Sequence, residues 1–432
     1  MKVWWEMTQL QTQPTKFRNY FDGDRLENID HSVLDNLKNF KAENSIDFVG
    51  MIWTENYINV FWPKGFKINP EELSLDEYRK KFLCLLKVLR KFSRDNSIYS
   101  YINGENKYTT YPIEIDIIED YLKNGLYENS EFRSRKSAEG KINWKKTISQ
   151  SDFYLNKKNI PIYLDFYSFQ RTKSDSLVVK IHKHIIQQAF NKIGWLFYEK
   201  GNYMHNNTAY ENLPLSKTNA VSQIRMELKR QFSEIKINQL KMMENFLLEK
   251  SGSSTKKEDN VVGINAFHVV WEKMCASFLN DQKSELKSSY YPVYSRNNEV
   301  SSILESLKSN SPKPDIIIFD GSRKIAIVDA KYYDFKKSKP GWSDLVKQFF
   351  YAKLYLKEYP QKIENFFIVP DVGITDIKRI SVVSEINKRK EFLDDDFPSI
   401  KIYYMNVDVL MSSYVNRKVG HMERKYILEG TL

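Results

Sequence analysis

The sequence predicts an α/β protein whose C-terminal part is a mixed sheet flanked by helices, preceded by an α+β N-terminal region. Two apolar runs, 316–319 and 325–328, are separated by the turn-forming segment DGSR, which predicts a β-hairpin. Amphipathic helical patterns lie on both sides of this hairpin, and the apolar segments ENFFIVP and SIKIYYMNV follow as strands. Helix, hairpin, helix, strand, strand is the order expected of a mixed sheet covered by helices.

The second strand of the hairpin is apolar on both faces until its end. Side chains alternate with period two, so Ile325, Ile327, Asp329 and Lys331 share one face, and the small residue Ala330 lies on the other. This pattern predicts a central, covered strand. Charges at the end of such a strand are costly unless they are paired, hydrated or bound to a metal.

Length and composition describe a folded protein with an excess of positive charge. The chain has 432 residues, 41% of them hydrophobic and 28% charged, which is enough for two or three domains. The net charge of +11 favours an anionic partner such as nucleic acid. With only two cysteines, Cys84 and Cys275, in apolar helical patterns, we expect buried thiols in a reducing compartment. No apolar run reaches the roughly 20 residues of a membrane span and no signal peptide is recognisable, so we expect a cytoplasmic protein with no membrane partner.

The N-terminal region mixes strands and helices. Residues 46–66 predict a strand pair, and helices are expected at about 76–92, 112–124, 176–199 and 218–249, the second of them ending at Gly125. The polar segment 251–260 is the best linker in the chain. We therefore expect three parts: an N-terminal α+β region at 1–250 for partner docking and DNA contact, a linker at 251–260, and a catalytic domain at 261–432.

The charged residues at the end of the hairpin predict a metal-dependent site. Pro314-Asp315 and, after thirteen intervening residues, Asp329-Ala330-Lys331 resemble the signature of PD-(D/E)xK nucleases. Two carboxylates at one sheet end, with the carbonyl oxygen of Ala330, would hold a hard cation such as Mg²⁺, for which Mn²⁺ would substitute. The metal would acidify a water molecule, and Lys331 would orient that water and stabilise charge on the phosphate. Two helical residues are further catalytic candidates: Glu272 upstream as an additional carboxylate, and Gln348 downstream as a polar group pointing into the same cleft.

A simpler interpretation remains open for each of these residues. The hairpin end could be solvated, with Asp329 and Lys331 forming a surface pair of little energetic value. His268 lies four residues before Glu272, but no other ligand pair has zinc-like spacing. His182 and His184 do not share a helical face. We therefore expect no zinc site, with these two histidines at the surface or hydrogen-bonded.

Longer segments resemble a known family. VDAKYY with DLVKQFFYAKLY is similar to the nuclease core of McrC-type restriction subunits, and FVGMIWTENYINVFWPKGF, GKINWKKTI and YYPVYS resemble the LlaJI-type restriction endonuclease family. The resemblance extends from about residue 46 to the C-terminus. It implies a restriction-endonuclease-like fold and a subunit that cuts double-stranded DNA with magnesium. It also implies a partner, a McrB-like AAA+ GTPase or ATPase subunit, which fits the absence of a GxxxxGK[ST] motif from this sequence.

Two surfaces are candidates for binding partners. The strand pair at 46–66 is a candidate for docking to the motor, although it could equally be a core hairpin. The second surface, a basic, turn-rich stretch, could bind DNA phosphates or be solvated; its residues are Arg133, Arg135, Lys136, Lys141, Lys145 and Lys146. Two other functions stay open: a non-cleaving DNA-binding or assembly subunit with a nuclease fold, and a stand-alone repair or mobile-element nuclease.

Overall fold

The structure, a computed structural model, groups the chain into two compact units. It describes residues 16–34, 41–42, 44–54, 57–69, 73–95, 112–137, 139–174, 176–197, 212–249, 261–282, 293–295, 303–306, 313–320, 324–358, 363–373, 377–386 and 389–430. One unit comprises Met1–Tyr111 with Ser254–Leu432, and the other Pro112–Ser253. The grouping differs from the expected division at 250, and the expected linker 251–260 lies outside the described residues.

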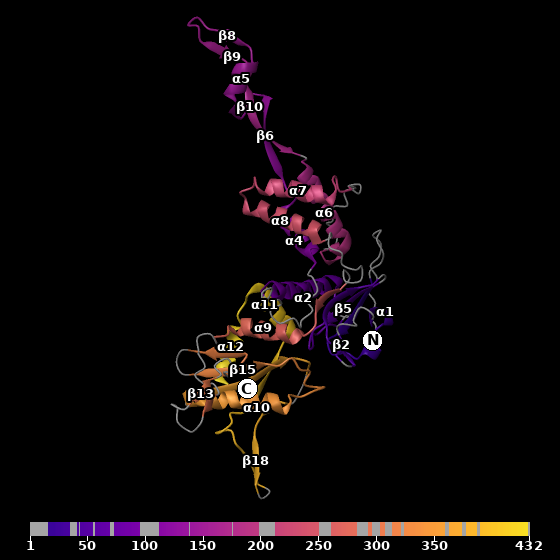
Figure 1. The fold of residues 1–432 in the computed structure, drawn as a ribbon, viewed down its shortest axis with the longest axis vertical. Coiled ribbons are helices and arrows are strands. Elements are labelled where there is room, and N and C mark those ends of the chain that lie inside the picture. The colour runs from indigo at the N-terminus through magenta and orange to yellow at the C-terminus, as the bar shows by residue number, and fades with distance from the viewer. Residues whose placement is uncertain are drawn as a thin grey trace. The chain divides into compact units, whose positions relative to one another are not determined.

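The first unit contains a four-stranded sheet with the order β1-β5-β4-β11. Its strands are β1 (Lys16–Phe21), β4 (Val49–Trp53), β5 (Tyr57–Trp62) and β11 (Val261–Ile264). β1 is parallel to β5, whereas β4 is antiparallel to both β5 and β11. Because β11 follows the expected linker in sequence, this sheet joins the N-terminal hairpin to the C-terminal part of the chain (Figure 1).

The expected strand pair at 46–66 is confirmed as β4 and β5, but it is a core hairpin. Both of its outer edges are paired, with β1 and β11, and Phe48, Ile52, Val60 and Phe61 are fully buried. α2 (Leu75–Asp95), which matches the expected helix, contacts β4. Because both of its edges are paired, this hairpin belongs to the core of the unit, as the alternative interpretation allowed. Its docking to the motor stays a prediction.

The C-terminal sheet is the predicted mixed sheet, with five strands in the order β14-β15-β16-β20-β17. The strands are β14 (Ile316–Phe319), β15 (Ile325–Ala330), β16 (Ile363–Pro370), β20 (Ile400–Met405) and β17 (Arg379–Ile380). β14 and β15 form the predicted antiparallel hairpin, β15, β16 and β20 run parallel, and β17 is antiparallel. Every residue of β15 is buried, which confirms the prediction of a covered, interior strand.

Helices cover this sheet. α10 (Trp342–Glu358) packs on β15 and β16, where Ala352 and Tyr355 form a cluster with Ile317, Ile325 and Ile327. α9 (Phe267–Leu279) contacts β14 and β15, and its apolar face is buried: Phe267, Val270, Trp271, Met274 and Phe278. The remaining helices here are α11 (Val407–Asn416), which packs on α2 and α9, and α12 (His421–Glu429).

Residues 63–67, here called the corner, connect the two sheets of this unit. The backbone N–H of Lys64 donates to the hydroxyl of Tyr332, immediately after Lys331, over 2.8 Å. Lys67 pairs with Asp371 just after β16 at 2.6 Å. Gly65 has φ +75°, and a Cβ there would lie 2.9 Å from that of Pro370. The corner thus packs on the carboxyl ends of β15 and β16.

The second unit consists of helices and an antiparallel ribbon (Figure 1). Its helices are α4 (Ile113–Asn124), α6 (Leu177–Ile193), α7 (Lys217–Leu228) and α8 (Glu234–Glu249). β6 (Asn129–Lys136) and β10 (Tyr167–Ser174) form the ribbon, which leads to β7 (Lys141–Ile142), α5 (Trp144–Gln150), β8 (Phe153–Leu155) and β9 (Pro161–Tyr163). We call residues 141–166 the arm.

Most N-terminal expectations are confirmed, with two corrections. α4 ends at Gly125 as predicted, where φ is 76°. The helix expected at 218–249 is two helices, separated at 229–233. The basic stretch expected to be a turn-rich loop is mostly strand and helix, because β6 pairs along its whole length with β10. Cys275 is buried as expected and Cys84 half-buried, both as free thiols.

The shorter described elements complete the chain. They are η1 (Leu26–Asn28), α1 (His31–Leu34), β2 (Lys41–Ala42), β3 (Ser45–Ile46), η2 (Gly194–Leu196), β12 (Val293–Ser295), β13 (Ile303–Ser306), β18 (Val383–Ile386) and β19 (Arg389–Phe392). Within the described ranges, no helix combines the length and the apolar character that crossing a bilayer requires.

Candidate active site

Asp315 and Asp329 meet at one end of the C-terminal sheet. β14 and β15 pair with Ile316 opposite Val328, so continuing this register by one residue sets Asp315 opposite Asp329. The backbone N–H of Ala330 donates to Oδ2 of Asp315 over 3.0 Å, which fixes that carboxyl group against β15. Asp329 is only 8% exposed. Two carboxyl groups therefore lie side by side in a largely dehydrated place.

Burial raises the pKa of both carboxyl groups. For Asp329, loss of hydration and the adjacent Asp315 raise the pKa to about 7, against the opposing effect of Lys331. For Asp315, burial and the charge of Glu272 raise the pKa, although hydrogen bonds with Asp329 and with the Ala330 N–H act in the other direction. Such a pair resists holding two negative charges at neutral pH unless a cation joins it.

Lys331 is the cation nearest to this pair. Its ammonium lies 2.7 Å from Oδ2 of Asp329 and 3.0 Å from Oδ1 of Asp344. Burial alone would lower the pKa of Lys331, but the two carboxylates raise it overall, so the side chain stays charged. Tyr333 donates its hydroxyl to Oδ2 of Asp344 over 2.6 Å and so orients that carboxylate. Asp329 and Lys331 do not form a solvated surface pair, because both side chains are largely buried.

Glu272 lies close enough to influence the pair. Glu272 lies on α9, and its negative charge raises the pKa of Asp315. Burial, and then the charges of Asp315 and Glu272, raise the pKa of the Cys275 thiol. Within the described ranges, however, no three acidic, histidine or cysteine side chains are grouped closely enough to hold a metal ion. Glu272 therefore contributes negative charge near the pair without completing a three-ligand cluster.

Gln348 does not point into the cleft. The side chain is 1% exposed, and its amide donates to Oδ1 of Asn365 at 2.7 Å and to the carbonyl oxygens of Ile327 and Phe366 at 3.3 Å. It thus bridges β15 and β16 beneath Asp329. A sequence pattern cannot distinguish this inward position from a cleft position, because both lie on the sheet-facing side of α10.

Asp344 and Tyr351 belong to the site although the sequence reasoning did not include them. Burial and the charges of Asp329 and Asp315 raise the pKa of Tyr351, so the negative charge of the pair acts on this residue. Asp344, Gln348 and Tyr351 are spaced at i, i+4 and i+7 on α10, so they share one face. This polar stripe on an amphipathic helix is the sequence signal from which Asp344 and Tyr351 could have been assigned to the site.

The donor set fits a hard divalent cation. The carboxylates of Asp315 and Asp329 and the backbone carbonyl of Ala330 offer only oxygen atoms, which Mg²⁺ prefers. The ammonium of Lys331 is shared between Asp329 and Asp344, while the negative charge of Glu272 also acts on Asp315. This excess of negative charge, with the raised pKa values, is relieved by a bound cation.

The basic stretch is a surface of the second unit, with two of its lysines engaged locally. Lys136 pairs with Asp165 at 2.5 Å, and Lys146 lies 4.8 Å from the centre of the Tyr167 ring. Arg135, Lys141 and Lys145 are exposed, whereas nothing of the Arg133 side chain is described. The arm, which contains Lys141 and Lys145, also exposes many large apolar side chains. They include Trp144, Ile148, Phe153, Tyr154, Leu155, Ile160, Ile162 and Leu164.

His182, His184 and His268, the histidines weighed in the sequence, lie on α6 and α9. His182 is buried, its Nδ1 accepts the backbone N–H of Tyr127 over 2.9 Å, and burial lowers its pKa to about 4. His184 contacts Gln188 at 2.8 Å. Burial also lowers the pKa of His268.

Comparisons with known proteins identify a family and several similar chains. The sequence profile described as LlaJI restriction endonuclease matches residues 48–408. The Type II restriction enzyme BsuMI component YdjA of Bacillus subtilis (strain 168) is 24% identical over 368 residues, 80% of this chain and 76% of that protein. Two solved structures are also similar. A chain in the half-complex of Thermococcus gammatolerans McrB AAA+ hexamers with bound McrC has a TM-score of 0.38 and 14% identity, covering 93% of this chain and 99% of that one. A chain in the cryo-EM structure of the Thermococcus gammatolerans McrBC complex has a TM-score of 0.22 and 11% identity, covering 54% and 79%.

Proposed function

Because this chain belongs to the LlaJI restriction endonuclease family, we propose that it is the DNA-cutting subunit of a restriction system and hydrolyses phosphodiester bonds in duplex DNA with Mg²⁺. Family membership makes it a nuclease; the metal, the duplex substrate and the roles of individual residues are our proposal. The supporting observation is the pair of buried carboxyl groups, Asp315 and Asp329, on facing strands beside Lys331. We assign cutting to 261–432, within the unit that also contains residues 1–111.

Asp315, Asp329 and the carbonyl oxygen of Ala330 would hold the ion. When bound, Mg²⁺ supplies positive charge that neutralises the phosphate and acidifies a water molecule. The N–H of Ala330 holds the Asp315 carboxyl group in place, so little reorganisation is needed when the cation binds. Glu272 acts at longer range, since its negative charge favours binding of a cation by Asp315.

Lys331 acts on the water and the phosphate. Its raised pKa keeps it charged at neutral pH, and Asp344 anchors it at 3.0 Å from one side. Held in this position, the ammonium would orient the attacking water and stabilise charge on the phosphate. Asp344 and Tyr333 are positioning residues for this ammonium. Gln348 has a supporting role, because it fixes β15 to β16 just below Asp329.

A separate motor subunit is the proposed partner. The family resemblance and the absence of a GxxxxGK[ST] motif support a McrB-like AAA+ GTPase or ATPase. Within the N-terminal region 1–250, the arm offers the exposed apolar surface that a stable protein interface requires, with Phe153, Leu155 and Leu164 each more than half exposed. The adjacent lysines give that surface a positive rim, which also leaves DNA contact by the basic stretch as part of the proposal.

Cleavage of plasmid DNA by the purified chain with Mg²⁺, with and without the co-expressed motor subunit, tests this function. Asp329→Ala should abolish cutting by at least about a hundredfold while the complex still assembles. Asp395→Ala, the same substitution at an exposed position, is the matched control. If Asp329→Ala cuts at the normal rate, the nuclease site is misassigned. If the wild-type complex binds DNA but never cuts it, the chain is a non-cleaving subunit, and cutting without any partner would indicate a stand-alone nuclease.

A further inference from the structure

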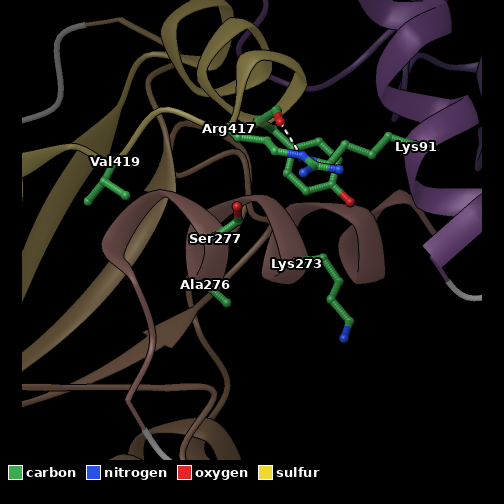
Figure 2. A pocket seen from close by; sticks show the side chains of 7 residues that line it. Lys91, Lys273, Ala276, Ser277, Arg417 and Val419 are labelled. Atoms are coloured by element: carbon green, nitrogen blue, oxygen red, sulfur yellow. Dashed lines mark hydrogen bonds between the residues drawn. The ribbon is translucent and has the colours of Figure 1, made fainter.

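A basic pocket lies on the first unit, away from the carboxylate pair. Its volume is about 470 Å3, and it is lined by Lys91, Lys273, Ala276, Ser277, Tyr414, Arg417 and Val419. Figure 2 shows Lys91 extending from α2 towards Arg417, while Lys273 and Ser277 project from α9. The pocket is thus formed by three elements that are distant in sequence: α2, α9 and the end of α11.

The lining of this pocket is cationic. It includes two lysines and one arginine but no aspartate or glutamate. The Lys91 ammonium donates to the carbonyl oxygen of Tyr414 and lies 4.1 Å from the centre of its ring, which holds one positive charge at the wall. Lys273 and Arg417 are exposed. Like charges brought to one concave surface repel each other unless an anion joins them.

The wall that presents Arg417 is rigidly built. Arg417 is the C-cap of α11, with φ 54° and its backbone N–H bonded to the carbonyl oxygens of Ser413 and Tyr414. The Gly420 N–H donates to the Phe278 carbonyl over 2.9 Å, and a Cβ on Gly420 would lie 2.2 Å from Cζ of Phe278. Glycine is the usual residue at such a left-handed cap. An arginine there keeps a cation at the pocket in a backbone conformation that side chains disfavour.

The pocket and the candidate active site share helix α9. Lys273 lines the pocket and directly follows Glu272, whose charge acts on Asp315. A duplex that occupies the active site presents further phosphates at a spacing of about 3.4 Å per nucleotide along the axis of each strand. A cationic pocket on the same helix as Glu272 is therefore a suitable place for one of those phosphates.

We propose that this pocket binds a phosphate group of the DNA backbone outside the bond that is cut. The inference rests on the proposed function, because it assumes that DNA is the substrate. Lys273 and Arg417 contact the phosphate oxygens, Ser277 donates its hydroxyl, and Lys91 supplies a fixed positive charge. Such a contact carries no base information; it sets the register of the duplex on the protein.

The test measures DNA binding by the full chain in the Asp329→Asn background, which keeps the DNA intact. Binding of a labelled 30-base-pair duplex is followed by fluorescence anisotropy from 50 to 300 mM NaCl. Lys273→Gln and Arg417→Gln should each weaken binding about three- to tenfold and reduce the slope of log K against log salt by about 1. Lys390→Gln, an exposed lysine on β19, is the control and should change neither quantity.

A second pair of variants separates binding from folding. Arg417→Gly removes the cation and relieves the left-handed backbone, so the thermal midpoint should stay the same or rise while DNA affinity falls. Asn280→Gly relieves the corresponding cap of α9, where φ is 53°, without removing a charge, and should leave affinity unchanged. Inorganic phosphate and ATP serve as competitors, and both should displace the duplex from wild type more readily than from Lys273→Gln.

The outcomes are distinct. Unchanged affinity and salt slope in Lys273→Gln and Arg417→Gln, with wild type binding and cutting DNA, would overturn the pocket proposal and leave the nuclease intact. Saturable binding of ATP at this pocket without any effect of the variants on the duplex would also overturn it, since the anion would then be a free nucleotide. A wild-type chain that neither binds nor cuts DNA, alone or with the motor, would contradict the proposed function itself.

Discussion

Asp329 is subject to two opposing effects. Its burial and the neighbouring Asp315 favour the protonated form, whereas Lys331 at 2.7 Å favours the carboxylate. The first effect is larger, since the pKa is raised to about 7. A group with this pKa is half protonated in neutral solution, and a cation must therefore displace a proton in order to bind.

The first prediction concerns the pH dependence of metal binding. Below about pH 7, the Mg²⁺ concentration for half-maximal cleavage should rise about tenfold per pH unit, because each ion displaces one proton from Asp329. Above about pH 8 it should level off. Cleavage rates titrated with Mg²⁺ between pH 5.5 and 8.5 measure this. A half-saturation concentration independent of pH would contradict the raised pKa.

The second prediction concerns stability without metal. The pKa of Asp329 is raised on folding, so the folded chain binds this proton more tightly than the unfolded chain does, and the resulting stability is present below about pH 4 and is lost as the pH rises to about 7. Asp329→Asn should therefore raise the free energy of unfolding by about 1–3 kcal/mol at pH 8. At pH 4 its effect should be small. Urea unfolding in EDTA at both pH values measures the difference, with Asp395→Asn as control.

At the scale of elements, the corner fixes the geometry of the catalytic strand. Tyr332 alternates with Lys331, so its ring lies on the α9 side, where it packs against Phe267 and Trp271, while the Lys64 N–H donates to its hydroxyl. The Lys64 ammonium lies 4.6 Å from the centre of the same ring and 3.8 Å from the buried Asp22. A segment almost 270 residues upstream thus holds the residue next to Lys331 in place.

The third prediction tests this contact through Gly65. Gly65→Ala places a Cβ 2.9 Å from the Cβ of Pro370 and 3.1 Å from the carbonyl oxygen of Asp371, so backbone at the end of β16 must shift. We expect a loss of about 2–4 kcal/mol in unfolding free energy together with slower cleavage. Gly23→Ala is the matched control, because its φ is also positive and its Cβ meets only the flexible end of Lys64 at 3.2 Å. Equal losses of stability and cleavage in the two variants would show that the positive φ, and not the contact with Pro370 and Asp371, causes the effect.

At the scale of the whole molecule, the unit that contains the candidate active site is discontinuous in sequence. β11 pairs with β4, and the corner contacts the ends of β15 and β16. Removing the N-terminal residues would leave one edge of β11 unpaired and would expose Val261, which packs in one cluster with Phe48 and Phe61. Deletion of the N-terminus is therefore a poor test of partner docking, because it also damages the nuclease unit.

The fourth prediction follows from this organisation. A fragment of residues 254–432 should be unstable and inactive, whereas co-expression with a fragment of residues 1–111 should restore a folded, DNA-cutting unit. Circular dichroism and plasmid cleavage measure the two properties. A folded, active 254–432 fragment would favour the division at 250 that the sequence suggested.

The fifth prediction concerns docking of the motor. The triple variant Phe153→Ser, Leu155→Ser, Ile162→Ser should reduce binding to the motor and stimulation of its nucleotide turnover at least about tenfold, since it removes three exposed apolar side chains of the arm. Cleavage of DNA that needs the motor should fall in parallel. The control is Val383→Ser, Phe392→Ser, which alters an exposed cross-strand pair of β18 and β19. Full stimulation by the arm variant would place the interface elsewhere.

The sequence by itself determined the hairpin, its covered second strand and the helices on its two sides. Apolar alternation, the DGSR turn and amphipathic periodicity are local properties, and they also set Asp315 and Asp329 at the same end of facing strands. The three central residues of the site were predictable for this reason, whereas the family was predicted from the resemblance of longer segments. Their catalytic roles remain a prediction.

Only the tertiary structure decided which distant segments meet. The pairing of β4 with β11, the contact of Lys64 with Tyr332 and the inward position of Gln348 depend on long-range packing. The basic pocket likewise joins Lys91, Lys273 and Arg417 from three separate helices. A polar residue on the sheet-facing side of a helix has the same pattern whether it bonds to buried backbone or lines a cleft, so no periodicity distinguishes the two. That choice is made by the registers and contacts of elements remote in sequence, which form only when the whole unit packs.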